Sequence, residues 1–405
     1  MRAAALDDPR RIRHADIDLL SLALIDARNL TLRWLAVFEA RGLDGVVFGK
    51  GSPRGWAGHA AWHQEYWIAR HVQRQRGEHA GSGALRLPSI EHRADEWFRL
   101  PTAGSTGAPG VPGPDSAQVR AYMAETMDTT LELLAGSDPT DDALHFFRAA
   151  LLHEDRIGEH LAEIAAASQL ASEPDPPPPW RAPPARPPRE ALWMPAQAFM
   201  IGAAEGGFVP DNERGSHEVS IPEFEIDAQA VSWSRYVEFA EDGGYDRREL
   251  WTDDGWAWVQ QQGRRGPRDA EQLRGGVLVT RQGRTQRVPP TQPVLHVSRH
   301  EAMAWCRWAG RRLPTEPEWE LAAQRAVSRG FAWGDVFEWV AGSARAWPGH
   351  RSSPGSLDPM PAPGSQGVLR GASWLTPARW HHPRARRFCV PEADMMFCGF
   401  RSCTL

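Results

Sequence analysis

Apolar residues recur every three or four positions in four long stretches of the first 170 residues, which is the spacing of one face of an α-helix. We therefore predict helices over residues 16–40, 59–76, 116–135 and 141–167. Asp16 and Ser116 stand where N-caps are expected. In the first helix the predicted apolar face contains Leu19, Leu22, Ile25, Leu30 and Leu35. Four long helices predict a bundle, a fold that can hold a metal ion between facing helices.

Proline and glycine mark the divisions of the chain. Residues 173–190, EPDPPPPWRAPPARPPRE, predict an extended, semi-rigid linker, and LPTAGSTGAPGVPGPD over residues 100–115 predicts a loop between the second and third helices. After the linker we expect a strand, a turn, a second strand and a helix over residues 219–244, and an amphipathic helix over residues 298–313. The predicted organisation is a helical bundle over residues 1–172, the linker, and an irregular α+β domain over residues 191–405.

Composition narrows the class of protein. The 405 residues are 41% hydrophobic and 24% charged, as in globular proteins, and 19 tryptophans predict aromatic-lined pockets as well as a core. The net charge of −5 offers no footprint for nucleic acid. The sequence shows neither an apolar run of about 18 residues nor a secretory signal, so we expect a cytoplasmic protein without a membrane partner. The four cysteines form no CxxC pair, which argues against zinc knuckles and thioredoxin chemistry.

Several stretches carry the motifs of a known family. RRLPTEPEWELAA, VLRGASW and GFRSC resemble the formylglycine-generating, C-type-lectin-like domain. The resemblance is narrowed to the sulfoxide synthases of ergothioneine biosynthesis by GGFVPDNERGSHEVSIPEFEID and EDGGYDRRELWTDDGWAW. The DinB-type bundle fused in front of those enzymes is resembled by GHAAWHQEYW and HEDRIGEH. LSLALIDARN, EYWIARHVQRQRG and FCGFRSC are most similar to the selenoneine synthases. The resemblance implies an α+β multidomain protein, a four-helix DinB-like bundle followed by an irregular formylglycine-generating-enzyme-like domain.

The resemblance to the ergothioneine/selenoneine synthase family implies a nonheme iron enzyme. Such an enzyme uses iron(II) and O₂ to join sulfur or selenium to the imidazole C2 of hercynine. The expected partners are small molecules, namely a hercynine-like betaine, a selenosugar or thiol donor, and O₂. The iron is expected between the two domains on three histidines, since neutral nitrogens suit Fe(II) and open positions are needed for O₂.

One of the three implied ligand positions has changed. The resemblance assigns His59 of the GHxxW motif and His153 of an HExxH-like helix as ligands. The second histidine of that helix would share the face of His153, but Ile157 stands in its place. His160 lies about 10 Å along the axis and cannot replace it without distorting the helix. His63, four residues after His59, restores the lost spacing on another helix, so it is either a third ligand or a substitute for the aromatic residue usual there.

Three positions that the resemblance links to the substrate or to proton transfer have also changed. Arg156 stands where the family contacts hercynine. Trp347 lies in the loop that carries a proton-donating tyrosine in the family, and an indole cannot transfer that proton at neutral pH. Arg387 replaces a substrate-binding asparagine. With Arg384 and Arg386 it favours a carboxylate or phosphate, although each of these arginines could equally lie on a solvated basic strand.

These changes leave two hypotheses from different classes. The first is a divergent iron-dependent enzyme that forms a carbon–sulfur or carbon–selenium bond on hercynine. The second is a catalytically degenerate paralogue that binds a histidine betaine or a partner protein. A copper-dependent, formylglycine-type oxidase would need a cysteine pair beside RGASW, and none of Cys306, Cys389, Cys398 and Cys403 stands there. The iron content of the purified protein separates the first two hypotheses.

Overall fold

The computed structural model describes residues 5–81, 83–99, 113–170 and 182–405. In the N-terminal half four long helices pack against one another: α3 (Ile17–Glu39), α4 (Pro53–Gln64), α6 (Ser116–Ala135) and α7 (Asp141–Ala167). Shorter helical segments accompany them, which are α2 (Pro9–Arg13), η1 (Glu65–Ala69), η2 (Arg74–His79) and α5 (Ala94–Phe98). The helices predicted over residues 116–135 and 141–167 are confirmed. Most of the predicted loop at 100–115 and the first half of the predicted linker lie outside the described residues.

The helix predicted over residues 59–76 is wrong at both ends. The α-helix begins at Pro53, where the Ser52 side chain accepts a hydrogen bond from the backbone N–H of Gly55 at 3.1 Å. It ends at Gln64, and the wider turn η1 and then the 3₁₀ segment η2 follow. Periodicity failed here because apolar spacing continues through turns with different hydrogen bonding. The N-cap of α6 is Asp115 rather than Ser116, because its carboxylate completes a capping box.

The buried face of α3 agrees only in part with the predicted one, of which Leu35 is buried. Leu22 and Ile25 are each 40% exposed, whereas Leu20, Ala23 and Ala27 are buried. The contact of α3 with α7 covers this second face. Apolar residues lie all around the helix, so spacing alone did not select the face that packs.

The C-terminal half is built mainly on two four-stranded sheets. One has the order β1-β4-β13-β8, formed by Leu192–Met194, Phe224–Ile226, Cys403–Thr404 and Arg311–Arg312. The other has the order β11-β10-β9-β12, formed by Arg386–Cys389, Gly367–Gly371, Phe337–Ser343 and Cys398–Phe400. Only β9 and β12 pair in parallel within these two sheets. These strands are the irregular α+β core expected after the linker.

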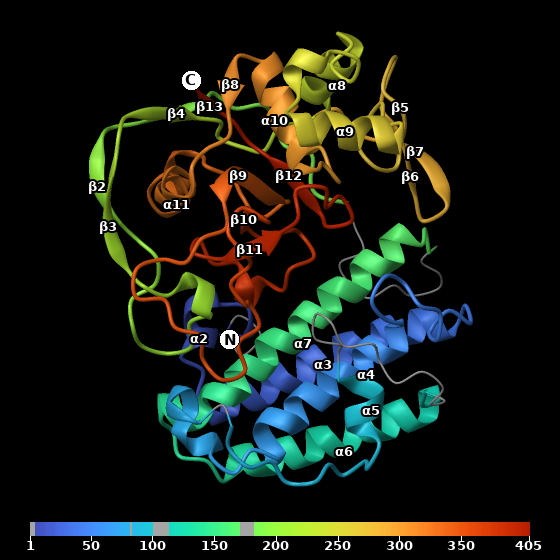
Figure 1. Ribbon diagram of the computed structural model, residues 1–405, viewed down its shortest axis with the longest axis vertical. Helices are drawn as coiled ribbons and strands as arrows, with labels where there is room; N and C mark the ends of the chain where they lie inside the picture. The colour runs from blue at the N-terminus through green and yellow to red at the C-terminus, as the bar shows by residue number, and fades with distance from the viewer. Residues whose placement is uncertain (1–4, 82, 100–112, 171–181) are drawn as a thin grey trace.

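Two smaller sheets and several helices complete this half. β2 (Gln197–Ile201) pairs with β3 (His217–Ile221), and β5 (Ala270–Gln272), β6 (Leu278–Arg281) and β7 (Arg284–Arg287) form a sheet close to the end of α7 (Figure 1). The helices are α8 (Trp233–Glu241), α9 (Asp253–Gln262), α10 (Arg299–Trp308) and α11 (Glu316–Arg325), with short turns η3 (Asp211–Glu213), η4 (Arg248–Leu250), η5 (Val327–Arg329) and η6 (Ala378–Trp380). The strand, turn, strand and helix predicted over residues 219–244 are confirmed. The helix predicted over 298–313 is confirmed only as far as Trp308, because Arg311–Arg312 form strand β8. None of the helices in the described ranges has the length and apolar character that crossing a membrane requires.

The motif residues of the C-terminal half form buried ion pairs. Arg370 of β10 pairs with Glu316 at 3.1 Å and with Glu320 at 2.5 Å on α11. Arg401 pairs with Glu338 of β9, and both side chains are at most 1% exposed. Removing one partner of a buried pair costs about 3–5 kcal/mol because the other charge is left unpaired. These motif positions therefore hold the fold, whatever chemistry the chain performs.

Carboxylates on α7 fix this helix to the C-terminal half. Asp155 accepts hydrogen bonds from Arg379 at 2.6 and 2.7 Å. Glu159, one turn further on, accepts a hydrogen bond from Thr376 and pairs with Arg387. Figure 1 shows α7 running diagonally between the other long helices and the C-terminal sheets. Side chains of α7 that point away from the bundle are thus held by the other half of the chain.

Candidate metal and substrate site

A cavity of about 600 Å³ lies where α4 and α7 meet a loop of the C-terminal half. The loop covers residues 353–357. The cavity is lined on the helical side by His59 and His63 of α4, Trp67 of η1, and His153, Arg156 and Ile157 of α7. The structure therefore brings together, from two helices, the three histidines singled out in the sequence.

His59 is oriented by a backbone carbonyl. Its Nδ1 lies 2.8 Å from the carbonyl oxygen of Phe98. Because a carbonyl only accepts, Nδ1 carries the proton and Nε2 keeps its lone pair. Burial lowers the pKa of His59 to about 4, although the carbonyl bond acts in the opposite sense. A neutral imidazole with one nitrogen held by a carbonyl is the usual form of a metal-binding histidine.

The distance between His59 and His153 suits two ligands of one ion. Their ring centroids are 5.0 Å apart and their planes make an angle of 67°. An imidazole bound at about 2.1 Å keeps its centroid about 3.2 Å from the ion, so two rings lie about 4.5 Å apart at a right angle and about 5.2 Å apart at a tetrahedral angle. Burial, followed by the neighbouring His63, lowers the pKa of His153 well below its ordinary value. Both imidazoles are therefore neutral at pH 7.

His63 is close to the pair but is stacked on His153. The two ring centroids are 3.9 Å apart and the planes are inclined by 11°. Nitrogen lone pairs lie in the ring plane, so parallel rings direct them side by side rather than toward one point. The Nδ1 atoms of both rings are buried without a hydrogen-bond partner. Burial, followed by the neighbouring His59, lowers the pKa of His63 to about 3. This arrangement supports the role of an aromatic neighbour more than that of a third ligand.

Ile157 occupies the remaining implied ligand position. It is 5% exposed and belongs to an apolar cluster with Trp34, Phe38 and Leu161. Within the described residues, no three His, Cys, Asp or Glu side chains are arranged to hold one metal ion. The residues present thus fit an ion on two imidazoles, those of His59 and His153, and supply no third protein ligand in this arrangement.

Arg28 of α3 fixes the helices that carry the histidines. Its Nε and Nη2 atoms donate to Glu154 of α7 at 2.5 and 3.0 Å, and Nη2 also donates to Gln64 of α4 at 2.5 Å. Nη1 donates to the backbone carbonyl of Met123 in α6. Glu154 and Gln64 each directly follow one of the cavity histidines in the chain. One buried guanidinium therefore ties all four long helices together at the level of the cavity.

Arg156 and Trp67 line the cavity beside the histidines. Both terminal nitrogens of Arg156 donate to Asp358, each at 2.9 Å. The Trp67 ring stacks on Phe146 with centroids 5.4 Å apart. The Arg86 guanidinium carbon lies 4.8 Å from the Trp67 ring centroid, so a cation of the protein already takes the cation–π contact of this ring. Sequence reasoning missed Trp67, although its place just after the GHAAWH stretch was a usable signal, and it missed Asp358, for which distance along the chain left none.

The other residues predicted to bind substrate lie outside the lining of this cavity. Arg387 pairs with Glu159 of α7. Trp347 is buried in the C-terminal core, with the Arg386 guanidinium 4.0 Å from its ring centroid. Arg384 and Arg386 face glutamates of α11. The anion expected near these arginines is thus supplied by the protein's own carboxylates, and substrate contacts of Arg387 and Trp347 stay predictions.

We expect the cavity histidines to make the metal-free protein sensitive to acid. His63 has a folded pKa of about 3 and an ordinary value of 6.5, so between these pH values the unfolded chain binds the proton and the folded chain does not. Stability therefore falls as pH decreases through this window, by about 1.4 kcal/mol per pH unit for one such group. His63→Phe should reduce the loss between about pH 6.5 and pH 5 by about 2 kcal/mol, measured by urea unfolding. The same change at His92, whose side chain is 86% exposed, is the control for the loss of a surface imidazole.

Comparison with known proteins agrees with the motifs. Residues 181–335 match a sulfatase-modifying factor enzyme 1-like domain. A hercynine oxygenase of Mycolicibacterium thermoresistibile is 29% identical over 94% of this chain and 94% of its own length. A formylglycine-generating enzyme of Streptomyces coelicolor is 33% identical over 43% of this chain and 58% of its own. The solved structure of PvdO from Pseudomonas aeruginosa covers 54% of this chain and 99% of its own at 20% identity, with a TM-score of 0.35.

These comparisons define the class of protein. The C-terminal half carries a sulfatase-modifying factor enzyme 1-like domain preceded by a helical region. The chain as a whole is a homologue of the hercynine oxygenases, which confirms the family resemblance inferred from the sequence.

Proposed function

We propose that the chain is a divergent iron(II)- and O₂-dependent enzyme that joins sulfur or selenium to the imidazole C2 of hercynine or a similar histidine betaine. The observation that most supports this is the pair of neutral imidazoles, His59 and His153, at a ligand-like separation in one cavity. The hercynine oxygenases among its relatives point to the same substrate class. The proposal includes the division of the chain into a DinB-like bundle, a linker and a formylglycine-generating-enzyme-like domain.

Bound iron(II) would supply the activation of O₂. The side chains of the cavity would hold the ion and line the space for the substrate. His59 and His153 would hold the ion, and the hydrogen bond from His59 to the carbonyl of Phe98 keeps its Nε2 unprotonated. Trp67 would form an apolar wall beside the trimethylammonium group of the betaine. Arg156 lines the same cavity and both of its terminal nitrogens donate to Asp358, so it would shape the pocket rather than offer an unpaired charge to the substrate carboxylate.

A catalytically degenerate binding protein is the second candidate. It is favoured by Ile157 at the third ligand position and by the stacking of His63 on His153. In addition, no tyrosine is among the residues that line the described cavity, so the phenolic proton donor implied by the family has no counterpart there. Such a protein would keep the betaine pocket formed by Trp67 and Arg156 without turning substrate over.

Replacing Trp67 tests the substrate class independently of catalysis. Trp67→Ala should weaken hercynine binding to the iron-free protein by about 3- to 30-fold, because the apolar wall beside the trimethylammonium group is lost. Trp193, 54% exposed on β1, provides the matched control, since its replacement should leave binding unchanged. Calorimetric titration measures both. Equal affinity in parent and Trp67→Ala would remove hercynine from this cavity.

Oxygen uptake separates the two candidates. The protein is purified anaerobically, loaded with Fe(II), and given hercynine, O₂ and either a thiol or a selenosugar. The proposed enzyme should consume O₂ only when hercynine and a donor are both present, and His153→Ala should abolish the uptake. Hercynine binding without iron retention and without uptake would favour the degenerate paralogue.

A further inference from the structure

The GHxxW stretch contains two further motif residues beside His59, namely Gly58 and Trp62. All three lie on α4 and are buried. Neither Gly58 nor Trp62 is among the residues that line the histidine cavity. Their contacts nevertheless converge on the His59 imidazole, at one of its edges through the short helix α5 and at one of its faces through the indole.

Gly58 allows α5 to approach α4 closely. A Cβ atom at position 58 would overlap the ring of Phe98, which lies against the glycine and is 2% exposed. This ring has little room to move away, because it also stacks on Tyr122 of α6 with centroids 5.3 Å apart. The carbonyl oxygen of Phe98 accepts the hydrogen bond from Nδ1 of His59 at 2.8 Å. A side chain at position 58 would therefore displace the residue that holds His59.

Trp62 covers one face of His59. The indole and the imidazole have centroids 5.5 Å apart and planes inclined by 19°, which is an offset stack. The indole is itself fixed, because its Nε1–H donates to Asp95 of α5 at 2.7 Å. Asp95 is held in turn by both terminal nitrogens of Arg70, each at 2.9 Å. α5 therefore acts on His59 twice, directly through Phe98 and indirectly through Asp95 and Trp62.

These contacts select one orientation of the imidazole. A half-turn of the ring would put the carbon Cδ2 where Nδ1 now lies, so the hydrogen bond to the carbonyl of Phe98 would be lost. The carbonyl thus decides which edge of the ring faces α5, and the stack on Trp62 fixes the plane of the ring. Together they keep Nε2 unprotonated and give it one direction. Metal-binding histidines are commonly oriented by a partner of their second nitrogen.

We propose that Gly58 and Trp62 are positioning residues for the metal site. Gly58 admits Phe98 to the edge of the imidazole, and Trp62 transmits the restraint from Asp95 to its face. The inference rests on the proposed function, because it takes His59 as a ligand of the ion. It gives a physical reason for the glycine and the tryptophan of the GHxxW stretch, both of which act through His59.

The tautomer of His59 tests this inference on the metal-free protein. Protein labelled with nitrogen-15 histidine is compared by NMR at about pH 7.5, and His59→Gln identifies the signal. The parent should be protonated at Nδ1 alone. Gly58→Ala should show both tautomers because the carbonyl is displaced, and Trp62→Leu should do so because the ring is no longer held in the plane of the hydrogen bond. In the matched control Gly158→Ala the new Cβ lies 3.6 Å from Leu30, an ordinary contact, and His59 should keep one tautomer.

The affinity for iron(II), measured by anaerobic equilibrium dialysis, gives a second readout. Gly58→Ala and Trp62→Leu should each weaken binding about tenfold or more, as is usual when the groups that orient a ligand are lost. Trp62→Phe should recover part of this affinity, because a phenyl ring still stacks on the imidazole.

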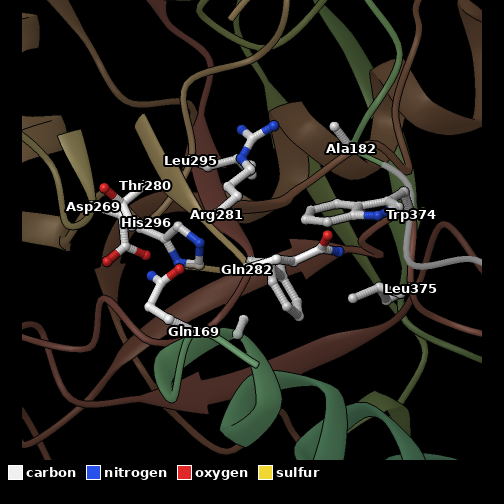
Figure 2. A pocket seen from close by; sticks show the side chains of 12 residues that line it. Gln169, Ala182, Asp269, Thr280, Arg281, Gln282, Leu295, His296, Trp374 and Leu375 are labelled. Carbon is white, nitrogen blue, oxygen red and sulfur yellow. The ribbon is translucent and has the colours of Figure 1, made fainter. Parts of the chain in front are cut away.

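Trp374→Phe is the control for the loss of an indole and should bind iron like the parent. Trp374 packs edge-to-face on Phe397 with centroids 4.6 Å apart. It lines a second pocket, shown in Figure 2, which has room for about two water molecules. Ala166 of this pocket is thirteen residues beyond His153 on α7, about 20 Å along the axis. The same pocket is lined by the four described residues other than glycine with positive φ: Gln169, Asp269, Gln282 and His296.

Two outcomes contradict the inference. One is a single Nδ1–H tautomer in folded Gly58→Ala and Trp62→Leu, and the other is the iron affinity of the parent in both variants. Far-UV circular dichroism shows whether each variant folds, and Trp62→Leu with Trp62→Phe decides the question if Gly58→Ala does not. If the parent binds no iron, the proposed function fails, and the tautomer alone then decides whether Gly58 and Trp62 orient His59.

Discussion

Ile157→His should raise the affinity of the protein for iron(II) by at least about tenfold. Ile157 lines the histidine cavity one helical turn after His153, so an imidazole there would share the face of that ligand. A third neutral nitrogen would then join His59 and His153. Anaerobic titration with Fe(II), followed by equilibrium dialysis, measures the change. Replacing a buried isoleucine by a polar ring should lower the free energy of unfolding by about 1–3 kcal/mol. The variant has to remain folded for its iron affinity to be compared with that of the parent.

Two companion variants make this result interpretable. Ile157→Asn introduces a polar side chain without an imidazole and should leave iron affinity near that of the parent. His63→Ala should also have little effect if His63 only stacks on His153, whereas complete loss of iron would show that His63 turns to become a ligand. If Ile157→His folds and binds iron no better than the parent, α7 is no longer part of a metal site. The degenerate binding protein would then be the better account.

Arg28→Met should lower the free energy of unfolding of the helical half by about 3–5 kcal/mol. The change removes the bonds to Glu154 and Gln64 and leaves the Glu154 carboxylate, 1% exposed, without its cation. Because both partners directly follow cavity histidines, the variant should also lose iron affinity and hercynine binding together. Urea unfolding followed by far-UV circular dichroism measures the stability.

A double variant and a surface pair provide the controls for Arg28. Arg28→Met combined with Glu154→Met should recover much of the loss, because no charge is left buried. Arg120→Met removes the pair with Glu39, whose side chains are 38% and 24% exposed, and should cost about 1 kcal/mol or less. Similar losses in Arg28→Met and Arg120→Met would show that the network around Arg28 does not hold the helices.

Local signals predicted the elements that have clear ends. Asp16 caps α3 as expected, and α7 begins and ends where the periodic pattern does. The helix over residues 59–76 failed because a π-turn and a 3₁₀ turn keep apolar spacing while changing the hydrogen bonds. On α3 the apolar spacing did not select one face, so Leu22 and Ile25 were assigned to the apolar face although α7 covers the opposite side.

In the candidate site, local motifs identified the residues, but their contacts depend on how the helices pack. The motif positions identified His59 and His153 because they stand in short, recognisable stretches, and the spacing of four residues identified His63. The stacking of His63 on His153 could not be read from that spacing, because it depends on how α4 lies against α7. Nor could the sequence indicate that Asp358 would hold Arg156, since about 200 residues separate them.

The sequence alone predicted the helical first half, the change from long helices to short strands and turns after the proline-rich segment, and the family resemblance. It could do so because caps, periodicity and motifs are local properties. The fold decided which charges meet. The sequence predicted an anion site at three neighbouring arginines, Arg384, Arg386 and Arg387. In the fold each of them pairs with a glutamate of α11 or α7, namely Glu320, Glu316 and Glu159 respectively. Four residues with strained backbones, scattered from position 169 to position 296, gather around one pocket for the same reason. Packing sets the distances between segments that are far apart in sequence, and those distances determine which charged side chains find a partner within the protein.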